Sequence, residues 1–293
     1  MTSAFDGRLL KLTISIDGSS DVFVFDQNYY ITATGTKFTN GNFGEFAVRL
    51  DNISKSTRDL IINKTSLWNL NKKVANVLLE VGRASYGTFQ VLQGQCIAIT
   101  PTQPPDIGLM FNSLANIGAA GIINGYTASP VATLQAIAQS IATANQLNLE
   151  WHVSPENNTV VGNYHFTGSV ATQVRKLQDL GSIKAYVDPP NLVVTDYYGA
   201  RGSNVVQVNA QTGMIGVPQL TASGARVKQL IQNDVLIGSS VKVQSQINPG
   251  ANGTYWLNKL AFEVSSWDTP FYWIMDLVLP INPTHNPATG ALT

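Results

Sequence analysis

Hydrophobic and polar residues alternate over much of the first hundred positions, which is the period-two pattern of half-buried β-strands. The stretch Leu12–Ile16 shows it most clearly, because each apolar residue there has a polar neighbour on either side. Strands are predicted over residues 12–16, 22–30, 46–50, 74–81 and 88–99. We expect Pro101, Pro104 and Pro105 to end further ladder pairing, since proline donates no backbone hydrogen bond.

The period changes to that of α-helices in the middle of the chain. One apolar stripe has its members three and four positions apart, at Val131, Leu134, Ile137, Ile141 and Ala142. A helix is therefore predicted there, with Ser129 as its N-cap and Pro130 at its first position. A second helix is predicted from Ser169 to Gly181, and a hairpin over residues 184–195 turns at Asp-Pro-Pro-Asn.

Strand patterns return after residue 201. Alternating, β-branched and aromatic residues predict strands over residues 205–208, 241–247, 255–264 and 271–279. The stretch Asn-Pro-Gly-Ala-Asn-Gly at 248–253 is a strong turn signal between two of them. From Pro280 onward we expect loop.

A short repeat relates the two strand-rich regions. Gly-Thr-Phe-Gln-Val, which begins at Gly87, recurs 166 residues later as Gly-Thr-Tyr-Trp-Leu, which begins at Gly253. At the same offset Pro104 falls on Pro270, and an alternating strand precedes each copy. Because the copies lie on either side of the helical region, they suggest two related β-domains around an insert.

The composition is unusual in its low charge. The 293 residues carry 18 basic and 18 acidic side chains, so charged residues are 12% of the chain, against about 25% in typical domains. The hydrophobic share of 44% is too high for a disordered protein, and the basic face of a nucleic-acid binder is missing. The only local excess lies between residues 49 and 83, with seven basic residues against three acidic ones, and is interpreted as a solvated or interface face.

No sequence feature indicates export or membrane insertion. Charged residues, among them Asp6 and Arg8, occupy the region where a signal peptide needs an apolar run, and no run of about 18 apolar residues occurs. Cys96 is the single cysteine, which excludes an internal disulfide and a cysteine-based metal cluster. We expect the protein to be made and folded in a cytosol.

Catalytic motifs are missing or poorly placed. His152, His165 and His285 do not have the spacing of a zinc-binding helix. Ser239 and Lys242 match the Ser-x-x-Lys pattern of acyl transferases, but the pattern lies on a predicted strand, where positions three apart point to opposite faces. We therefore expect no catalytic residue, metal site or cofactor, and no enzyme. A hydrolase that uses scattered carboxylates stays open as an alternative.

Aromatic residues gather near the C-terminal end, at Tyr255, Trp256, Phe262, Trp267, Phe271, Tyr272 and Trp273. They could form a platform on which sugars stack. They could equally be core and subunit interface, where aromatic side chains bury large areas. Because Val and Leu flank them on predicted strands, the second interpretation is favoured, with Trp256, Trp267, Phe271, Tyr272 and Trp273 as the candidate interface residues.

Four segments of the last third carry a resemblance to a known family. They are Thr212–Pro218, Thr221–Val227, Leu236–Val243 and Asn252–Leu257. This series resembles the last β-domain of the baseplate hub proteins of contractile-tailed bacteriophages, and the hub part of type VI secretion spike proteins is similar. In that pattern Gly216 and Pro218 open the domain, a short helical piece leads to a strand marked by Gly238, and Gly253 and Tyr255 belong to a hairpin. We expect a positive φ at Gly253, so that Gly253→Val would damage folding.

The rest of the chain fits the same family. Its middle resembles the family's insert domain, and residues 89–97 with the proline-rich loop after them resemble the first β-domain. The resemblance implies an α+β, mainly β fold, in which two tube-like β-barrel or sandwich domains, residues 1–110 and 201–293, flank a mixed α/β insert domain at residues 111–200.

The function that this resemblance implies is structural. The chain would form a homotrimer, the tail hub in the virion baseplate, which adapts a hexameric tail tube to a trimeric central spike around a channel for DNA. Its partners would be the tail tube protein, the central spike protein and other baseplate proteins, with genomic DNA only in passage and no membrane insertion. Assembly would take place in the bacterial host cytoplasm, and the spike would be a separate polypeptide. The alternatives are a β-rich glycan-binding, receptor-binding module that uses the C-terminal aromatics, and a tube subunit.

Overall fold

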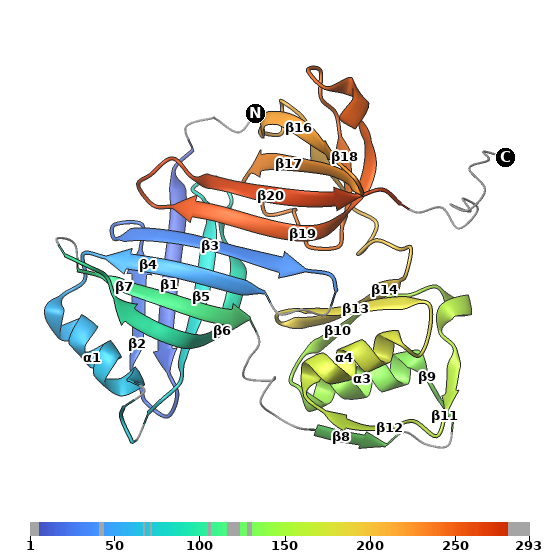
Figure 1. Ribbon diagram of the computed structural model, residues 1–293, viewed down its shortest axis with the longest axis horizontal. Helices are drawn as coiled ribbons and strands as arrows, with labels where there is room; N and C mark the ends of the chain where they lie inside the picture. Colours follow the sequence, from blue (N-terminus) through green and yellow to red (C-terminus); the bar gives the residue numbers. More distant parts are fainter. Residues whose placement is uncertain are drawn as a thin grey trace.

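A computed structural model describes residues 6–40, 44–66, 68–70, 72–104, 107–115, 124–127 and 131–280. In Figure 1 the first and last parts of the chain form one broad β-structure, and a small unit with two helices lies beside it. The mainly β fold class predicted from the sequence is confirmed.

The first β-half contains seven strands and a helix. The strands are β1 (Arg8–Ile16), β2 (Val22–Asp26), β3 (Tyr30–Phe38), β4 (Glu45–Asp51), β5 (Ala75–Arg83), β6 (Gly87–Pro101) and β7 (Leu109–Ala115), and the helix is α1 (Lys55–Thr65). Alternation explains β1, whose Leu10, Leu12, Ile14 and Ile16 are buried while the residues between them are partly exposed.

The second β-half follows residue 201. Its strands are β15 (Val205–Val208), β16 (Met214–Thr221), β17 (Gly224–Leu230), β18 (Ser240–Val243), β19 (Gly253–Ser265) and β20 (Phe271–Val278), with a 3-10 turn, η2, at Pro249–Ala251. In β20 the buried residues alternate with partly exposed ones over the whole strand, as expected for one face in a core.

The two β-halves share one sheet. The 13 described strands of this sheet run in the order β16-β17-β20-β19-β3-β4-β7-β6-β5-β1-β2, with β18 beside β19 and β15 beside β18. The halves meet where β3 pairs antiparallel with β19, in a register from Thr32 opposite Ser265 to Phe38 opposite Lys259. One continuous hydrophobic core, which contains Phe111 and Trp273, extends through both halves.

Each half has the same order of strand pairing. The first half reads β3-β4-β7-β6-β5-β1, and the second reads β16-β17-β20-β19-β18-β15. All of these neighbouring pairs are antiparallel except one: β15 and β18 are parallel, whereas their counterparts in the first half, β1 and β5, are antiparallel. Among the described elements, β2 and α1 have no counterpart in the second half. This topology extends the short sequence repeat to a whole set of strands.

The unit between the halves has its own core. Its elements are β8 (Asn124–Thr127), β9 (Val131–Thr133), α3 (Leu134–Ala144), β10 (Asn148–His152), η1 (Pro155–Asn157), β11 (Val160–Gly162), β12 (His165–Gly168), α4 (Val170–Gln178), β13 (Ile183–Asp188) and β14 (Asn191–Asp196). A sheet of β10, β14 and β13 packs against α3 and α4 through apolar residues such as Ile137, Val174 and Val194. The predicted hairpin over residues 184–195 is confirmed as β13 and β14.

The start of the first predicted helix was wrong. The N-cap of α3 is Thr133, whose hydroxyl accepts a hydrogen bond of 3.2 Å from the backbone N–H of Ala136. Val131 belongs to β9, while Ser129 and Pro130 lie outside the described residues. The N-cap of α4 is Ser169, as predicted, but this helix ends at Gln178, before Gly181.

Several elements were not predicted. The sequence analysis missed α1, whose N-cap Ser54 accepts a hydrogen bond from the N–H of Thr57, and it missed β7 and the β16–β17 hairpin. Pro101 ends β6 but still lies opposite Leu109, because an end position does not need the missing N–H. The expected helical piece between Pro218 and Gly238 is wrong, since these residues form strands and turns.

Of the two forms predicted for the β-domains, barrel or sandwich, the closed barrel is not found among the strands that the structure describes. The order of pairing is an open path, because β3 pairs with β19 of the other half instead of closing its own half.

No helix within the described ranges is long and apolar enough to cross a membrane.

Candidate functional site

The residues considered for catalysis are scattered. His152 lies on β10, His165 on β12, and His285 lies outside the described residues. Ser239 is buried in a turn before β18, whereas Lys242 is exposed on β18, so their side chains occupy different environments. Within the described part of the chain, no group of three or more His, Cys, Asp or Glu residues could hold a metal ion.

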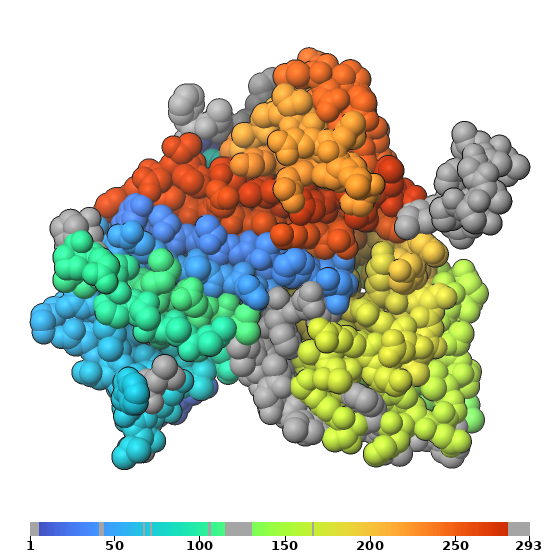
Figure 2. Space-filling model, viewed as in Figure 1, coloured from blue at the N-terminus to red at the C-terminus, as the bar shows by residue number. Residues whose placement is uncertain are grey.

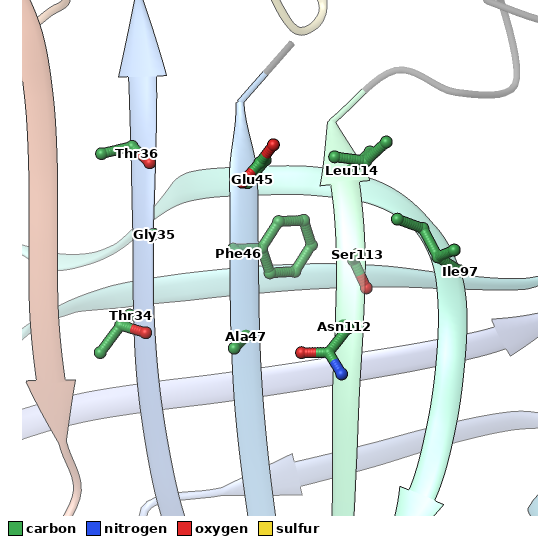
Figure 3. A pocket seen from close by; sticks show the side chains of 10 residues that line it. All are labelled: Thr34, Gly35, Thr36, Glu45, Phe46, Ala47, Ile97, Asn112, Ser113 and Leu114. Carbon is green, nitrogen blue, oxygen red and sulfur yellow. The ribbon is translucent and has the colours of Figure 1, made fainter.

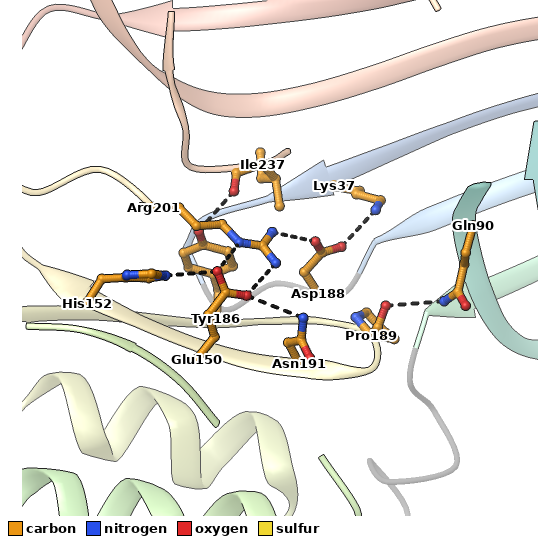
Figure 4. A network of polar contacts seen from close by, with 10 residues as sticks. All are labelled: Lys37, Gln90, Glu150, His152, Tyr186, Asp188, Pro189, Asn191, Arg201 and Ile237. Carbon is orange, nitrogen blue, oxygen red and sulfur yellow. Dashed lines mark hydrogen bonds and ion pairs between the residues drawn. The ribbon is translucent and has the colours of Figure 1, made fainter. Parts of the chain in front are cut away.

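The most concentrated chemistry is an ion-pair network where the insert meets the β-halves (Figure 4). Arg201 lies at its centre. Its Nε and Nη2 donate to the two carboxylate oxygens of Glu150 at 2.9 and 2.7 Å, and its Nη1 donates to Asp188 at 2.7 Å. Lys37 of β3 donates to the other oxygen of Asp188 at 2.7 Å. The network therefore links β10, β13 and β3.

Ion pairing holds these groups in their charged forms against the effect of burial. Burial alone would raise the pKa of Asp188, but the charges of Lys37 and Arg201 outweigh it and leave that pKa below its usual value. Hydrogen bonds from Arg201 lower the pKa of Glu150. Burial disfavours the charge of Arg201, but its two carboxylate partners overcome this and raise its pKa.

The tip of the β13–β14 hairpin contacts both β-halves. The hydroxyl of Tyr186 donates to the carbonyl of Ile237 in the second half at 3.0 Å, and the amide of Gln90 on β6 donates to the carbonyl of Pro189 at 3.2 Å. Gly238, with φ +87°, lies so close that a Cβ there would be 2.0 Å from the Tyr186 hydroxyl. We call the ion-pair network and these tip contacts the hairpin junction.

An aromatic cluster continues the junction toward β19. The Lys184 Nζ lies 4.7 Å from the ring centroid of Trp256 and 5.2 Å from that of Tyr197, and burial lowers the pKa of Lys184. Tyr198 packs between them, with ring centroids 4.9 Å from Tyr197 and 6.4 Å from Trp256. These contacts attach the insert to the second β-half.

Sequence reasoning missed the hairpin junction. Its residues come from six separate segments, around positions 37, 90, 150, 186–189, 201 and 237–238, and none forms a local motif. One signal was present in the sequence: Lys184 and Asp188 lie close to the Asp-Pro-Pro-Asn turn, although charged residues are only 12% of the chain.

A second feature is the outward face of the shared sheet. Around the centre of this face lies a shallow hollow of about 550 Å³ that β3, β4, β6 and β7 line (Figure 3). Thr34, Thr36, Ala47 and Asn112 face it, and Glu45 adds a carboxylate. Small and polar side chains make up part of this lining, and Leu114 and Ile97 add large apolar side chains to it.

The motif glycines occupy special backbone positions in three of four cases. Gly87, Gly216 and Gly238 have φ values of +79°, +71° and +87°, which favour glycine. The expectation for Gly253 was wrong, because its φ is not positive and a Cβ there would make an ordinary 3.4 Å contact with the ring of Tyr255.

The two other motif residues, Pro218 and Tyr255, are buried within the chain. Pro218 lies in β16, and Tyr255, 3% exposed, donates from its hydroxyl to the carbonyl of Ala251.

The C-terminal aromatics divide into two groups. Phe271 and Trp273 are each 1% exposed and belong to the core, whereas Trp256 and Tyr272 are half-buried. Trp267 is 57% exposed and contacts the ring of Tyr30. Trp256, Trp267 and Tyr272 are therefore the accessible members of the predicted interface set.

A family model matches most of the chain, and several solved structures have a similar fold. The family model described as baseplate hub gp41 matches residues 9–277. The fold is similar to that of the 43 kDa tail protein of prophage MuSo2 from Shewanella oneidensis, at 10% identity and a TM-score of 0.59, over 92% of this chain and 98% of that one. It is equally similar, with the same identity and TM-score, to the tail protein from Neisseria meningitidis MC58, over 92% and 96% of the two chains.

A third similar structure comes from a secretion system. The E. coli c3393 protein, a component of the type VI secretion system with structural similarity to the T4 bacteriophage tail proteins gp27 and gp5, matches at 10% identity and a TM-score of 0.55. The match covers 92% of this chain and 77% of that one. No curated protein sequence gives a significant match.

Proposed function

This chain belongs to the baseplate hub gp41 family, and on that premise we propose that it forms a homotrimer that adapts a hexameric tail tube to a trimeric central spike. It is a structural protein of the tail baseplate. In this role the trimer would surround a channel and directly contact the tube protein, the spike protein and neighbouring baseplate proteins.

The observation that carries the proposal is the repeated order of strand pairing. Two halves of similar topology, joined edge to edge through β3 and β19, give each chain two related surfaces. Three chains around a threefold axis would then present six related units to a sixfold tube. Closed rings need such equivalent surfaces, and the threefold axis remains available to the spike.

The insert gives the two halves a fixed attachment. The hairpin junction connects Asp188 and Pro189 of the hairpin to the first half and Tyr186 to the second half. We propose the domain layout 1–110, 111–200 and 201–293, in which Arg201 stands at the boundary between the insert and the second half.

The outward face of the sheet has the character expected of a wall of the proposed channel. Its central hollow is lined by Thr34, Thr36, Ala47 and Asn112 together with apolar Leu114 and Ile97, and the charges in and near it include both signs, for example Glu45 and Arg49. A wall of this kind would not bind the phosphates of DNA strongly, because such binding needs clustered Lys and Arg. DNA would therefore pass without a specific contact.

A glycan-binding module has less support. Its aromatic platform would need Phe271 and Trp273, whose rings lie in the protein's own core. An enzymatic role has no assembled site among the described residues, and the family and the similar proteins are named as tail and secretion components.

The test is the molar mass of the purified chain in solution, with negative-stain images of the same sample, alone and mixed with the tube and spike proteins of the same phage. We expect threefold rings with six lobes and an open centre, if not alone then in the mixture. A monomer that joins neither protein would refute the trimeric adapter.

A further inference from the structure

A basic, apolar projection extends from the first β-half beyond its sheet. It consists of α1 and the described residues 66, 68–70 and 72–74 that follow it, at the lower left of Figures 1 and 2. Trp68 is 95% exposed and Leu70 is fully exposed, while Ile97 on the neighbouring strand β6 is 52% exposed. Large apolar side chains at this degree of exposure mark interaction sites, and tryptophan is the residue most enriched where binding energy concentrates.

A groove lies beside Trp68. Its volume is about 200 Å³, and Ile62, Ile97 and Ile99 contribute apolar lining, with Lys72 and Lys73 at its border. Such a concavity can receive a side chain of another protein, whereas a flat lipid surface would leave it unfilled. We name Trp68, Leu70, Ile97, Lys72 and Lys73 the Trp68 patch.

The charge of this region is positive in a chain whose net charge is zero. Asp59 already pairs with Lys55 at 2.7 Å, and Asp21 pairs with Lys64. Within the described residues, no carboxylate lies within ion-pair distance of Lys72 or Lys73. Lys73 donates to the backbone carbonyl of Gly18, which does not neutralise its charge, so the negative charges that would balance the two lysines are expected on a partner.

We propose that the Trp68 patch is the docking site for another tail protein, whose surface offers an apolar pocket for Trp68 with an acidic rim for the two lysines. A second copy of the patch does not fit, because the like charges would repel. Since α1 has no described counterpart in the second half, the site occurs once per chain, and one partner binds per hub chain. This inference rests on the proposed hub function for the choice of a tail protein as partner.

The experiment titrates the purified full chain with each purified tube, spike and baseplate protein of the same phage, by biolayer interferometry at about 50 and 300 mM salt. We expect one of them to bind, with affinity that falls at the higher salt. Trp68→Ala should weaken it at least about tenfold, as should the double change Lys72→Glu and Lys73→Glu.

Two controls match these variants. Val131, which is 66% exposed on the insert, is changed to Ser, and the exposed Lys242 of the second half is changed to Glu; both should bind like the unaltered chain. Because Trp68 and Lys72 are exposed, Trp68→Ala and the single change Lys72→Glu should keep the melting temperature. The double change also removes the hydrogen bond from Lys73 to the carbonyl of Gly18, so the single change is measured beside it. The same samples are imaged, so that loss of the hub rings is detected separately from loss of the partner.

Three results would overturn the inference. In the first, no tail protein binds, or the patch variants bind as tightly as the controls. In the second, Trp68→Ala loses binding to vesicles of phosphatidylglycerol but keeps every protein contact, which would make lipid the occupant. In the third, the patch variants lose only self-association. If the negative-stain images still show threefold hub rings in any of these cases, the proposed hub function is not affected by the result.

Discussion

Replacing Arg201 by alanine tests the hairpin junction directly. The side chain of Arg201 is 4% exposed and pairs with Asp188 and Glu150, so its loss leaves two carboxylates without their principal donor. Removing one partner of a buried ion pair costs about 3–5 kcal/mol. Lys37 still pairs with Asp188, and the Glu150 side chain is 27% exposed, so we expect the lower end, about 3 kcal/mol.

The measurement is urea unfolding followed by tryptophan fluorescence, with thermal melting as a second probe. A loss of this size should lower the melting temperature by roughly 5–10 °C in a chain of this length. The melting temperature of Arg201→Lys should lie between those of the unaltered protein and Arg201→Ala, because lysine keeps the charge but loses the bidentate contact with Glu150.

The matched control is Arg226→Ala. Arg226 pairs with Asp276 in the same two-point fashion, but its side chain is 50% exposed, so its loss should cost less than about 1 kcal/mol. If Arg201→Ala destabilises the protein no more than Arg226→Ala, the argument that the junction is a buried, energetically important contact is refuted.

Three further predictions follow from individual residues. The depressed pKa of Asp188 means that its contribution is complete above its unfolded pKa of about 4 and is lost as pH falls through the folded value; Asp188→Asn should flatten this acid dependence in urea titrations at pH 2–7. Gly238→Ala should cost more than about 2 kcal/mol, since its Cβ would overlap the Tyr186 hydroxyl at a positive φ, whereas Gly253→Ala should stay within about 1 kcal/mol; equal effects in circular-dichroism melts would contradict this. Burial raises the pKa of Cys96 to about 11, so iodoacetamide at pH 8 should label the native thiol far more slowly than the unfolded one, and equal rates by mass spectrometry would show that the thiol is accessible.

The local sequence predicted those elements whose pattern repeats over neighbouring residues. The alternation at Leu12–Ile16 lies in β1, and the apolar stripe after Ser169 forms the buried face of α4. Alternation and helical spacing identify one buried face, and this information is contained within a few turns or pleats. The order of loose motifs along the last third was sufficient to indicate the hub family, although it placed a helix where β16 and β17 form a hairpin.

The pairing between the two halves and the backbone conformation at Gly253 depended on contacts that the local sequence pattern does not show. Nothing near Thr32 or Ser265 in sequence shows that β3 pairs with β19, because a strand edge can accept any partner with suitable register. The repeat at Gly253 correctly marked the start of a strand, but the backbone conformation there depended on the longer turn before it.

Local patterning and the order of motifs were sufficient to identify the class of fold, the strand faces and the family. Three features became visible only in the folded chain: the two halves share one sheet, Arg201 joins Glu150, Asp188 and, through Asp188, Lys37, and Trp68 stands exposed beside a groove. The physical reason is that sheet pairing, burial of charge and exposure are set by contacts between residues far apart in the chain, which neighbouring residues do not encode.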